Sequence, residues 1–186
     1  MTRRPLLIAL ALASLGLVAC GDSEPRVVSA GESEAAYVTL GATQYQVQIS
    51  RQLNPSEVRD RANLIGIPPA DRGLDAQEIW FGVWVRAFNR SERSERSADE
   101  FKIVDTRGHE YEPIALQPVN AFAYRSSLLQ PGSEYPAPGS AAAETSSTGA
   151  LLLFKLPVDA LSFRPLEFEF SSAALSGETS SITLDV

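Results

Sequence analysis

Residues 78–89 read EIWFGVWVRAFN, and this stretch decides the fold class because its apolar side chains fit two periodicities. Trp80 and Trp84 stand at helical spacing, whereas Phe81 and Val83 belong to an alternation that is typical of a strand. Aromatic and β-branched residues predominate and a glycine stands near the centre, which favours a strand over a helix. We therefore predict a central β-strand across the whole stretch.

The even-numbered face of this predicted strand raises the main functional question. It carries Trp80, Trp84, Arg86 and Phe88, with Gly82 between the tryptophans. If the odd positions point into the core, the even-numbered face is either covered by another segment or serves as a binding surface, because monomeric proteins rarely expose large apolar patches. Residues 115–148, with Phe122 and Tyr124, could fold over it, or it could be the core face itself. Alternatively, it is a surface for a partner or ligand, for which tryptophan and arginine are favoured anchors.

Other stretches with period-two alternation predict the remaining strands. They lie at 44–49, 101–111 (a hairpin with its turn at 105–108), 151–156, 166–170 and 182–186. In the first of them, Tyr45, Val47 and Ile49 are expected to share one buried face. Helix is expected only at 55–63, with Asn54 as its N-cap. This pattern predicts an all-β fold, an antiparallel immunoglobulin-like β-sandwich of about seven strands with at most one short helix besides a signal peptide.

The first twenty residues have the layout of a secretory signal. Arg3 and Arg4 precede an apolar run at 6–19, which ends at Cys20. The run is shorter than the roughly 20 residues that a helix needs to span a bilayer, so a transmembrane anchor is the weaker interpretation. An ordinary secretion signal, or a cysteine buried in a hydrophobic helix, remains an alternative.

Residues 17–20, LVAC, resemble the bacterial lipobox. The resemblance implies cleavage between Ala19 and Cys20, diacylglyceryl transfer to the Cys20 sulfur, and a lipid anchor on the extracytoplasmic face of the cell membrane. Two acyl chains make a stable anchor. The expected organisation is a signal peptide at 1–19, a lipidated cysteine and flexible acidic tether at 20–35, and a single β-sandwich domain at 36–186.

The composition of the chain excludes several classes of function. Its 16 basic residues stand against 23 acidic ones, a net charge of −7, which argues against nucleic acid and anionic lipid surfaces as partners. Cys20 is the only cysteine and Met1 the only methionine, so removal of a leader would leave no disulfide and no cysteine-based metal or nucleophile site. With a single histidine, a copper site of the His/Met type is excluded as well. We expect no cofactor and no metal.

Candidate catalytic groups have simpler structural interpretations. His109 follows a glycine in the predicted hairpin turn, and no G-x-S-x-G motif accompanies it, so we expect a surface turn histidine. Acidic residues surround that hairpin without matching a calcium loop, and are expected to be solvated: Asp99, Glu100, Asp105, Glu110 and Glu112. Glu167 and Glu169 would share a strand face about 7 Å apart, a separation that could suit a carboxylate pair, but alternating glutamates normally mark a wet face. The chain is therefore not expected to be an enzyme.

The order of strand motifs resembles a known domain type. The motifs are VWVRAFN (83–89), DEFKIVDTRGHEYEP (99–113), LLQPG (128–132), GALLLFKLP (149–157) and PLEFEF (165–170). Together they resemble the telokin-like, immunoglobulin-like domain of unknown function found in exported bacterial lipoproteins, which is similar in form to the mycobacterial immunoprotective extracellular proteins. The resemblance covers residues 36–186, departs at 54–76 and 130–148, and implies a fold without implying an active site.

The function expected from these observations is a membrane-anchored extracytoplasmic lipoprotein, acting as a non-catalytic binding or envelope-associated module. Its partners would be the lipid bilayer, through acylated Cys20, and a protein or small molecule of unknown identity. One alternative is a solute- or ion-binding accessory protein of a transporter or envelope enzyme, for which a pocket lined by the tryptophans and the long loop would be the discriminating feature. A carboxylate-dependent hydrolase is the other, and it would need a close, buried acid pair in a cleft.

Overall fold

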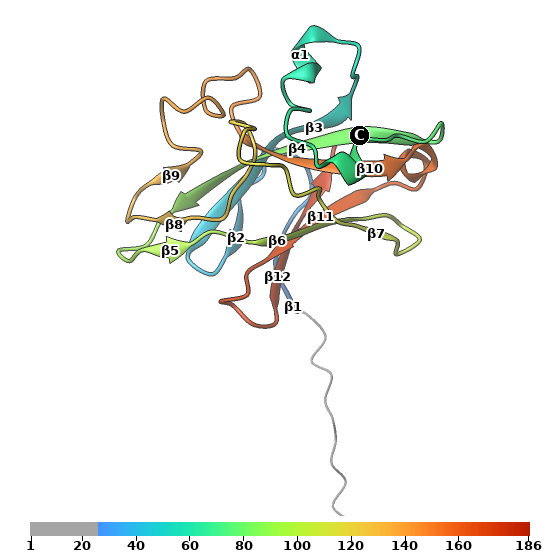
Figure 1. The fold of residues 1–186 in the computed structure, drawn as a ribbon. Helices are drawn as coiled ribbons and strands as arrows, with labels where there is room; N and C mark the ends of the chain where they lie inside the picture. Colours follow the sequence, from blue (N-terminus) through green and yellow to red (C-terminus); the bar gives the residue numbers. More distant parts are fainter. Residues whose placement is uncertain (1–25) are drawn as a thin grey trace, which may run out of the picture.

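The computed structural model describes residues 26–186, and within this range most of the regular secondary structure is β-strand, connected by several long loops (Figure 1). Seven of these strands have five or more residues: β1 (Arg26–Gly31), β3 (Thr43–Leu53), β4 (Glu78–Asn89), β6 (Glu100–Val104), β10 (Ala150–Pro157), β11 (Leu166–Ser171) and β12 (Glu178–Leu184). The shorter strands are β2 (Val38–Leu40), β5 (Glu95–Arg96), β7 (Glu110–Tyr111), β8 (Leu128–Leu129) and β9 (Glu134–Tyr135). Helical structure is limited to α1 (Val58–Arg61) and two 3₁₀ turns, η1 (Pro69–Asp71) and η2 (Val158–Ser162).

Two sheets form the layers of a β-sandwich. Sheet I has the strand order β10-β4-β3-β2, with β9 also paired to β4, and sheet II has the order β1-β12-β11-β6-β7. All pairings between the strands are antiparallel except that of β1 with β12, which is parallel. The predicted all-β sandwich is therefore confirmed, with one parallel pair at the edge of sheet II as a departure.

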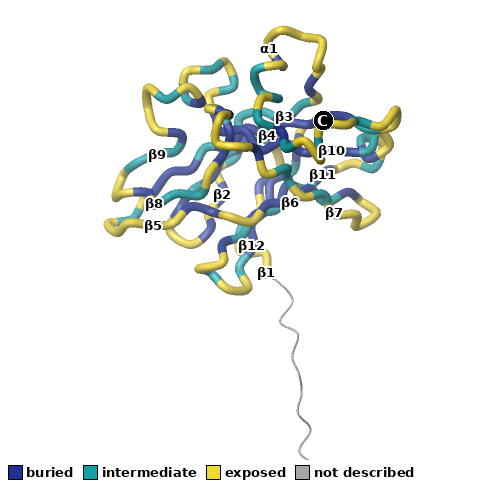
Figure 2. Tube along the Cα trace, viewed as in Figure 1, coloured by how far each residue is buried: buried dark blue, intermediate teal, exposed yellow. Residues whose placement is uncertain are grey.

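The main core lies between the two sheets. The odd-numbered residues of β4, such as Phe81 and Val85, point into it and are 1% exposed. Aromatic rings of sheet II face them, and Phe168 packs edge-on against Phe154 of sheet I with 6.4 Å between ring centroids. Figure 2 shows that the buried residues concentrate in these strands, whereas the segment around α1 is largely exposed. Of the two arrangements that the sequence left open, the structure therefore shows the one in which the odd positions of β4 face the main core.

A β-bulge in β3 changes which side chains share a face. Val47 pairs with Val85, but Ile49 pairs with Trp84, so Gln48 is the extra residue. An extra residue shifts the alternation by one position. Ile49 therefore packs against the outer cluster around Trp84 and not with Tyr45 in the main core, and the expectation of one shared face for 45, 47 and 49 was wrong at its last position.

The predicted hairpin and the predicted helix can both be compared directly with the structure. The hairpin at 101–111 is confirmed, with β6 and β7 joined by a turn in which Gly108 has a φ of +80°. The helix is shorter than predicted: α1 is one turn, its N-cap is Glu57, and the Asn54 side chain instead accepts a hydrogen bond from the Ser56 N–H, at 2.9 Å.

The predicted acidic tether at 20–35 was too long. Residues 26–31 form β1, which pairs with β12 over most of its length, so the domain begins at least ten residues before the predicted boundary at 36. The predicted cleavage site between Ala19 and Cys20 and the predicted lipidation of Cys20 lie outside the described residues. No helix among residues 26–186 is long and apolar enough to cross a membrane.

Candidate functional site

The even-numbered face of β4 is divided into a covered half and an open half. Trp80 and Trp84 are 3% and 1% exposed, and they belong to a second apolar cluster on the outer side of sheet I. The hypothesis that these two tryptophans form part of a partner surface is therefore corrected: their rings are buried under other segments. Arg86 and Phe88 lie on the half of the strand that these segments do not cover, and Arg86 is partly exposed.

Two segments cover the tryptophans. The predicted cover from 115–148 is present, with Leu116 buried and Phe122 partly buried in this cluster, although Tyr124 packs in the main core instead. The insertion between β3 and β4 supplies the rest of the cover through Ile67, with Leu64 and Leu74 beside it. Sequence reasoning missed this contribution, although the apolar run LIGI at 64–67 was a usable signal.

Asn120 joins the two covering segments to each other. Its side-chain amide donates hydrogen bonds to the backbone carbonyls of Asn63, at 2.9 Å, and Ile65, at 2.8 Å. Its side-chain oxygen accepts a hydrogen bond from the Phe122 N–H, at 2.9 Å. Asn120 is 3% exposed, so one buried side chain holds the insertion against the 113–124 segment.

On the open half of the face, charged and aromatic side chains are stacked. The Arg86 and Arg90 guanidinium carbons lie 4.8 and 5.2 Å from the centroid of the Phe88 ring, which is 8% exposed. The ring of Tyr37 lies 5.8 Å from that of Phe88 and is 57% exposed. Arg86 forms an ion pair of 2.6 Å with Glu134 of β9. The hypothesis that Phe88 forms part of a partner surface is therefore corrected as well: its ring is shielded by its neighbours, and Tyr37 presents the aromatic surface to solvent.

Beside this stack, three half-buried glutamines of β3 form what we call the amide row: Gln44, Gln46 and Gln48. Thr148 donates to the Gln48 side-chain oxygen at 3.0 Å, Gln48 donates to Gln46, and Gln46 donates to the Ala35 carbonyl at 2.6 Å. In the same row, the Gln44 oxygen accepts a hydrogen bond from Arg90, at 3.1 Å. The row is therefore held in place by a chain of hydrogen bonds across the sheet face.

A cleft of about 750 Å³ opens next to the amide row, and we call it the Arg51 cleft. Its lining includes Arg51, Asp60, Trp84, Phe122, Ser146 and Ser147. Arg51 stacks over Trp84, at 5.1 Å, and pairs with Asp60, at 2.6 Å. The hydrogen bond from Arg51 lowers the pKa of Asp60, burial opposes this effect, and the Asn54 N–H adds to it. Thr148 follows the lining residue Ser147 and bonds to Gln48, so this hydrogen bond links the edge of the cleft to the amide row.

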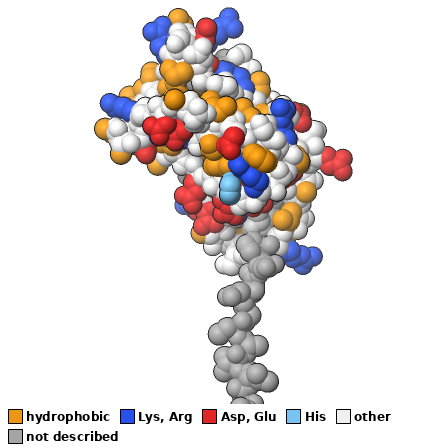
Figure 3. Space-filling view, turned by 90° about the vertical axis from the view of Figure 1, so that its right-hand side faces the viewer, with side chains coloured by type: hydrophobic (Ala, Val, Ile, Leu, Met, Phe, Trp, Pro, Cys, Tyr) orange, Lys and Arg blue, Asp and Glu red, His pale blue; other side chains and the backbone are white. Residues whose placement is uncertain are grey.

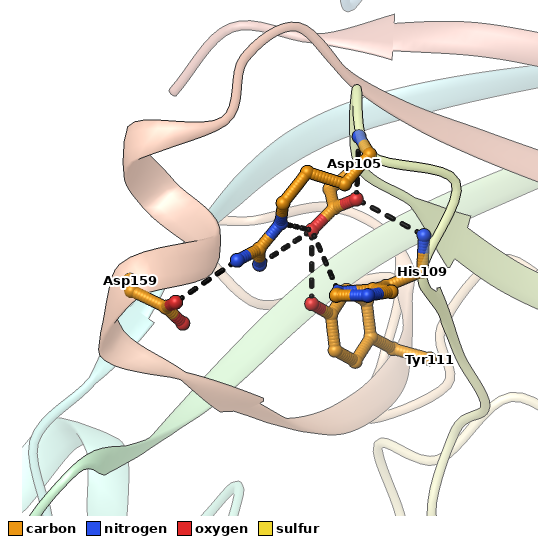
Figure 4. Close-up of polar contacts among 5 residues, drawn as sticks. Asp105, His109, Tyr111 and Asp159 are labelled. Carbon is orange, nitrogen blue, oxygen red and sulfur yellow. Dashed lines mark hydrogen bonds and ion pairs between the residues drawn. The ribbon is translucent and has the colours of Figure 1, made fainter.

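The hairpin carboxylate Asp105 is buried, which corrects the expectation that it is solvated. Its side chain accepts hydrogen bonds from the Arg107 and His109 N–H groups and from the Tyr111 hydroxyl, and forms an ion pair with Arg107 at 2.7 Å (Figure 4). Arg107 also reaches Asp159 of η2, at 3.0 Å. Burial raises the pKa of Asp105, but these hydrogen bonds outweigh it and hold the pKa well below its ordinary value of 3.8.

This arrangement fixes the turn and does not resemble a catalytic set. Both oxygens of Asp105 are occupied by hydrogen bonds from its own hairpin. The side chain of His109 is 59% exposed, and its Nδ1 lies 3.6 Å from Asp105, so the prediction of a surface turn histidine is confirmed. Figure 3 shows acidic side chains gathered near the histidine on this side of the molecule.

The two glutamates considered as a carboxylate pair lie on the wet face of sheet II. Glu167 accepts a hydrogen bond from Thr183, at 2.7 Å, and Glu169 lies 3.3 Å from the ammonium of Lys102. Both are only partly buried. Within residues 26–186, no group of three or more His, Cys, Asp or Glu side chains is placed to hold a metal ion.

Comparison with known proteins shows the fold alone. No family model and no curated protein matches the chain. Among solved structures it is similar to the yjhA protein of Bacillus subtilis, with a TM-score of 0.51, 11% identity and coverage of 83% of this chain and 99% of that one. It is also similar to the B. subtilis protein ycdA, described as a "putative lipoprotein", with a TM-score of 0.50, 11% identity and coverage of 83% and 39%. An uncharacterized β-sandwich protein of Clostridium difficile 630 has a TM-score of 0.44, 9% identity and coverage of 82% and 93%.

Proposed function

We propose that the chain is a membrane-anchored extracytoplasmic lipoprotein whose domain acts as a non-catalytic binding module. The anchor is Cys20, and the binding surface is the Arg51 cleft together with the amide row. The lipobox-like LVAC sequence and the similarity in fold to ycdA support the anchor. A 750 Å³ cleft, linked at its edge to a row of partly exposed amides by the Thr148–Gln48 hydrogen bond, supports the binding role.

The observation that carries this proposal is the position of the cleft relative to the start of the domain. β1 begins at one end of the molecule, and α1, which borders the cleft, lies at the opposite end (Figure 1). Six residues lead from Cys20 to Arg26, which can span at most about 20 Å. A lipid on Cys20 would therefore keep the β1 end near the membrane and direct the cleft away from it.

Replacing Cys20 with serine tests the anchor. We expect the parent chain to fractionate with membranes and to be released only by detergent, and the Cys20→Ser chain to be exported without tight membrane association. Tight membrane association of the serine variant would contradict the anchor.

A single new cysteine tests the extracytoplasmic placement of the cleft. Ser146 is exposed at the cleft, and the parent chain has no thiol other than Cys20. With Ser146→Cys, a membrane-impermeant maleimide should label intact spheroplasts. The parent chain is the control and should stay unlabelled because its only sulfur carries lipid. Labelling of the variant only after lysis would overturn the extracytoplasmic placement.

One observation favours the solute-binding alternative as a second candidate. Trp84 and residues 145–147 of the long loop both line the Arg51 cleft, as that alternative required, although Trp80 does not. The hydrolase alternative lacks such support, because Glu167 and Glu169 are not a buried pair in a cleft.

A further inference from the structure

We propose that the amide row and Tyr37 bind an uncharged, hydroxyl-rich polysaccharide. This inference rests on the proposed function, since it names the ligand class of the same surface. Four properties of the face carry it: the hydrogen-bonding capacity left on the amides, the exposed aromatic ring, the absence of ionisable side chains within the row itself, and the scarcity of apolar side chains.

The amides offer both donors and acceptors to a ligand. A glutamine side chain has two N–H donors and an oxygen with two lone pairs. Gln46 and Gln48 each give one N–H and receive one hydrogen bond in the chain from Thr148 to Ala35, which leaves one donor and one lone pair on each. A sugar hydroxyl is itself both a donor and an acceptor, so it can use both. Because the row is already held by hydrogen bonds, little side-chain entropy is lost on binding.

Tyr37 supplies the apolar contact that a sugar ring needs. A tyrosine ring offers a large, rigid apolar surface with a polar end. Tyr37 is 57% exposed and rests against Phe88, which is itself packed between Arg86 and Arg90. The C–H face of a sugar can stack on this supported ring while its hydroxyls reach the adjacent amides.

The distribution of charge selects an uncharged ligand. The amide row contains no ionisable side chain, and Arg86 beside it is paired with Glu134 at 2.6 Å. The Arg90 guanidinium is a cationic group at the end of the row, where it already donates to Gln44 and lies against the Phe88 ring. The chain as a whole carries a net charge of −7, which repels an anionic polymer. A cationic polymer would be attracted instead to the wet face of sheet II, where Glu167 and Glu169 lie. A row of uncharged amides on an acidic protein complements a neutral polymer.

The composition of the face also argues for a glycan over a protein partner. Protein interfaces have cores that are depleted in charge and enriched in aromatic and other apolar side chains. Beside the row, Tyr37 is the only large aromatic side chain that is more than one-third exposed within the described residues. Three amides around one ring fit a polyol better than an apolar protein surface.

Binding of the detergent-solubilised full chain to soluble polysaccharides tests the proposal. The probes are a neutral β-glucan, a neutral dextran and anionic polygalacturonate, compared by affinity electrophoresis. We expect retardation by at least one neutral polymer and none by the anionic one. Tyr37→Ala and Gln46→Ala should each weaken that binding about tenfold, since each removes contacts worth at least one or two hydrogen bonds. Tyr37→Phe, which keeps the ring, should retain most of it.

The matched control is Gln77→Ala, an exposed glutamine outside the amide row, which should bind like the parent chain. Thermal melts of all variants separate loss of binding from loss of fold. Binding only to the anionic polymer, an equal effect of Gln77→Ala and Gln46→Ala, or no binding to any of the three probes by a folded chain would each overturn the ligand class. A chain that passes the Cys20 and Ser146 tests but binds none of the probes would leave the proposed anchoring intact and refute this inference alone.

Discussion

Replacing Asn120 with alanine would remove the side chain that joins the two segments covering the tryptophans. Three hydrogen bonds are lost, to the Asn63 and Ile65 carbonyls and from the Phe122 N–H. Each such bond contributes about 1 kcal/mol net, and the groups left behind regain water only in part. We therefore expect the free energy of unfolding to fall by about 2–3 kcal/mol.

Urea denaturation followed by tryptophan fluorescence measures this loss of stability, and the fluorescence reports on the region beneath the cover. The chain has two tryptophans, Trp80 and Trp84, and both lie beneath the cover. For a domain of this size, the free energy of unfolding falls by about 2 kcal/mol per molar urea. The urea concentration at the midpoint of unfolding should therefore fall by about 1–1.5 M. The tryptophan emission should also shift to longer wavelength at a lower urea concentration than that at which the β-structure is lost. The reason is that opening the cover hydrates the rings before the two sheets separate.

The matched control is Asn63→Ala. Asn63 contributes its backbone carbonyl to the Asn120 side chain, and alanine keeps that carbonyl. Its own side chain makes only a long contact of 3.4 Å to Arg59, so the control should change stability by less than about 0.5 kcal/mol. If Asn120→Ala and Asn63→Ala have the same midpoint as the parent chain, the covering segments are not held by Asn120 and the argument fails.

Two further substitutions test the packing beneath the cleft and the buried hairpin carboxylate. In Gly82→Ala the new Cβ would lie 2.7 Å from the Trp84 ring, so we expect a loss of about 1–3 kcal/mol in urea denaturation, whereas Gly73→Ala, which has open space, should be neutral. Asp105→Asn should be less stable than the parent chain at pH 7. Because the folded pKa of Asp105 lies below the unfolded value of 3.8, its contribution is complete above about pH 5 and is lost as the pH falls toward the folded pKa. The difference in urea midpoint between the two chains should therefore narrow from pH 5 to pH 2, and a constant difference would show that ionisation of Asp105 does not stabilise the hairpin.

Local alternation was sufficient to predict most of the sandwich. The stretch at 78–89 forms β4 as predicted, and the turn before Gly108 joins β6 and β7. The bulge at Gln48 could not be predicted, because glutamine and apolar residues alternate without interruption through it. The phase of a strand is set by its partner as well as by its own pattern, and the pairing of Ile49 with Trp84 is a property of both strands.

Long-range contacts explain the other departures. β1 is a six-residue strand in a polar stretch, and it forms through parallel pairing with β12, about 150 positions later in the chain. Asp105 is buried because Arg107 lies over Phe163, with 3.6 Å to the ring centroid, and because η2 packs beside the hairpin. Neither Phe163 nor Asp159 is near the hairpin in sequence, so the acidic residues around it looked uniformly solvated.

The outer face of β4 is divided because its two tryptophans and its phenylalanine are removed from water in different ways. A buried tryptophan removes about 150–250 Å² from water, which is worth several kcal/mol, so Trp80 and Trp84 favour the folding of an insertion and a long segment over them. Phe88 needs no such cover, because Arg86 and Arg90 stack on its ring and keep their charged groups in water. The same strand therefore carries a rigid, covered half that supports the Arg51 cleft and a half that stays open beside the amide row. A ligand can reach the exposed amides and Tyr37 beside this half without displacing any part of the protein, whereas the buried ring of Trp80 could be reached only by displacing the covering segments.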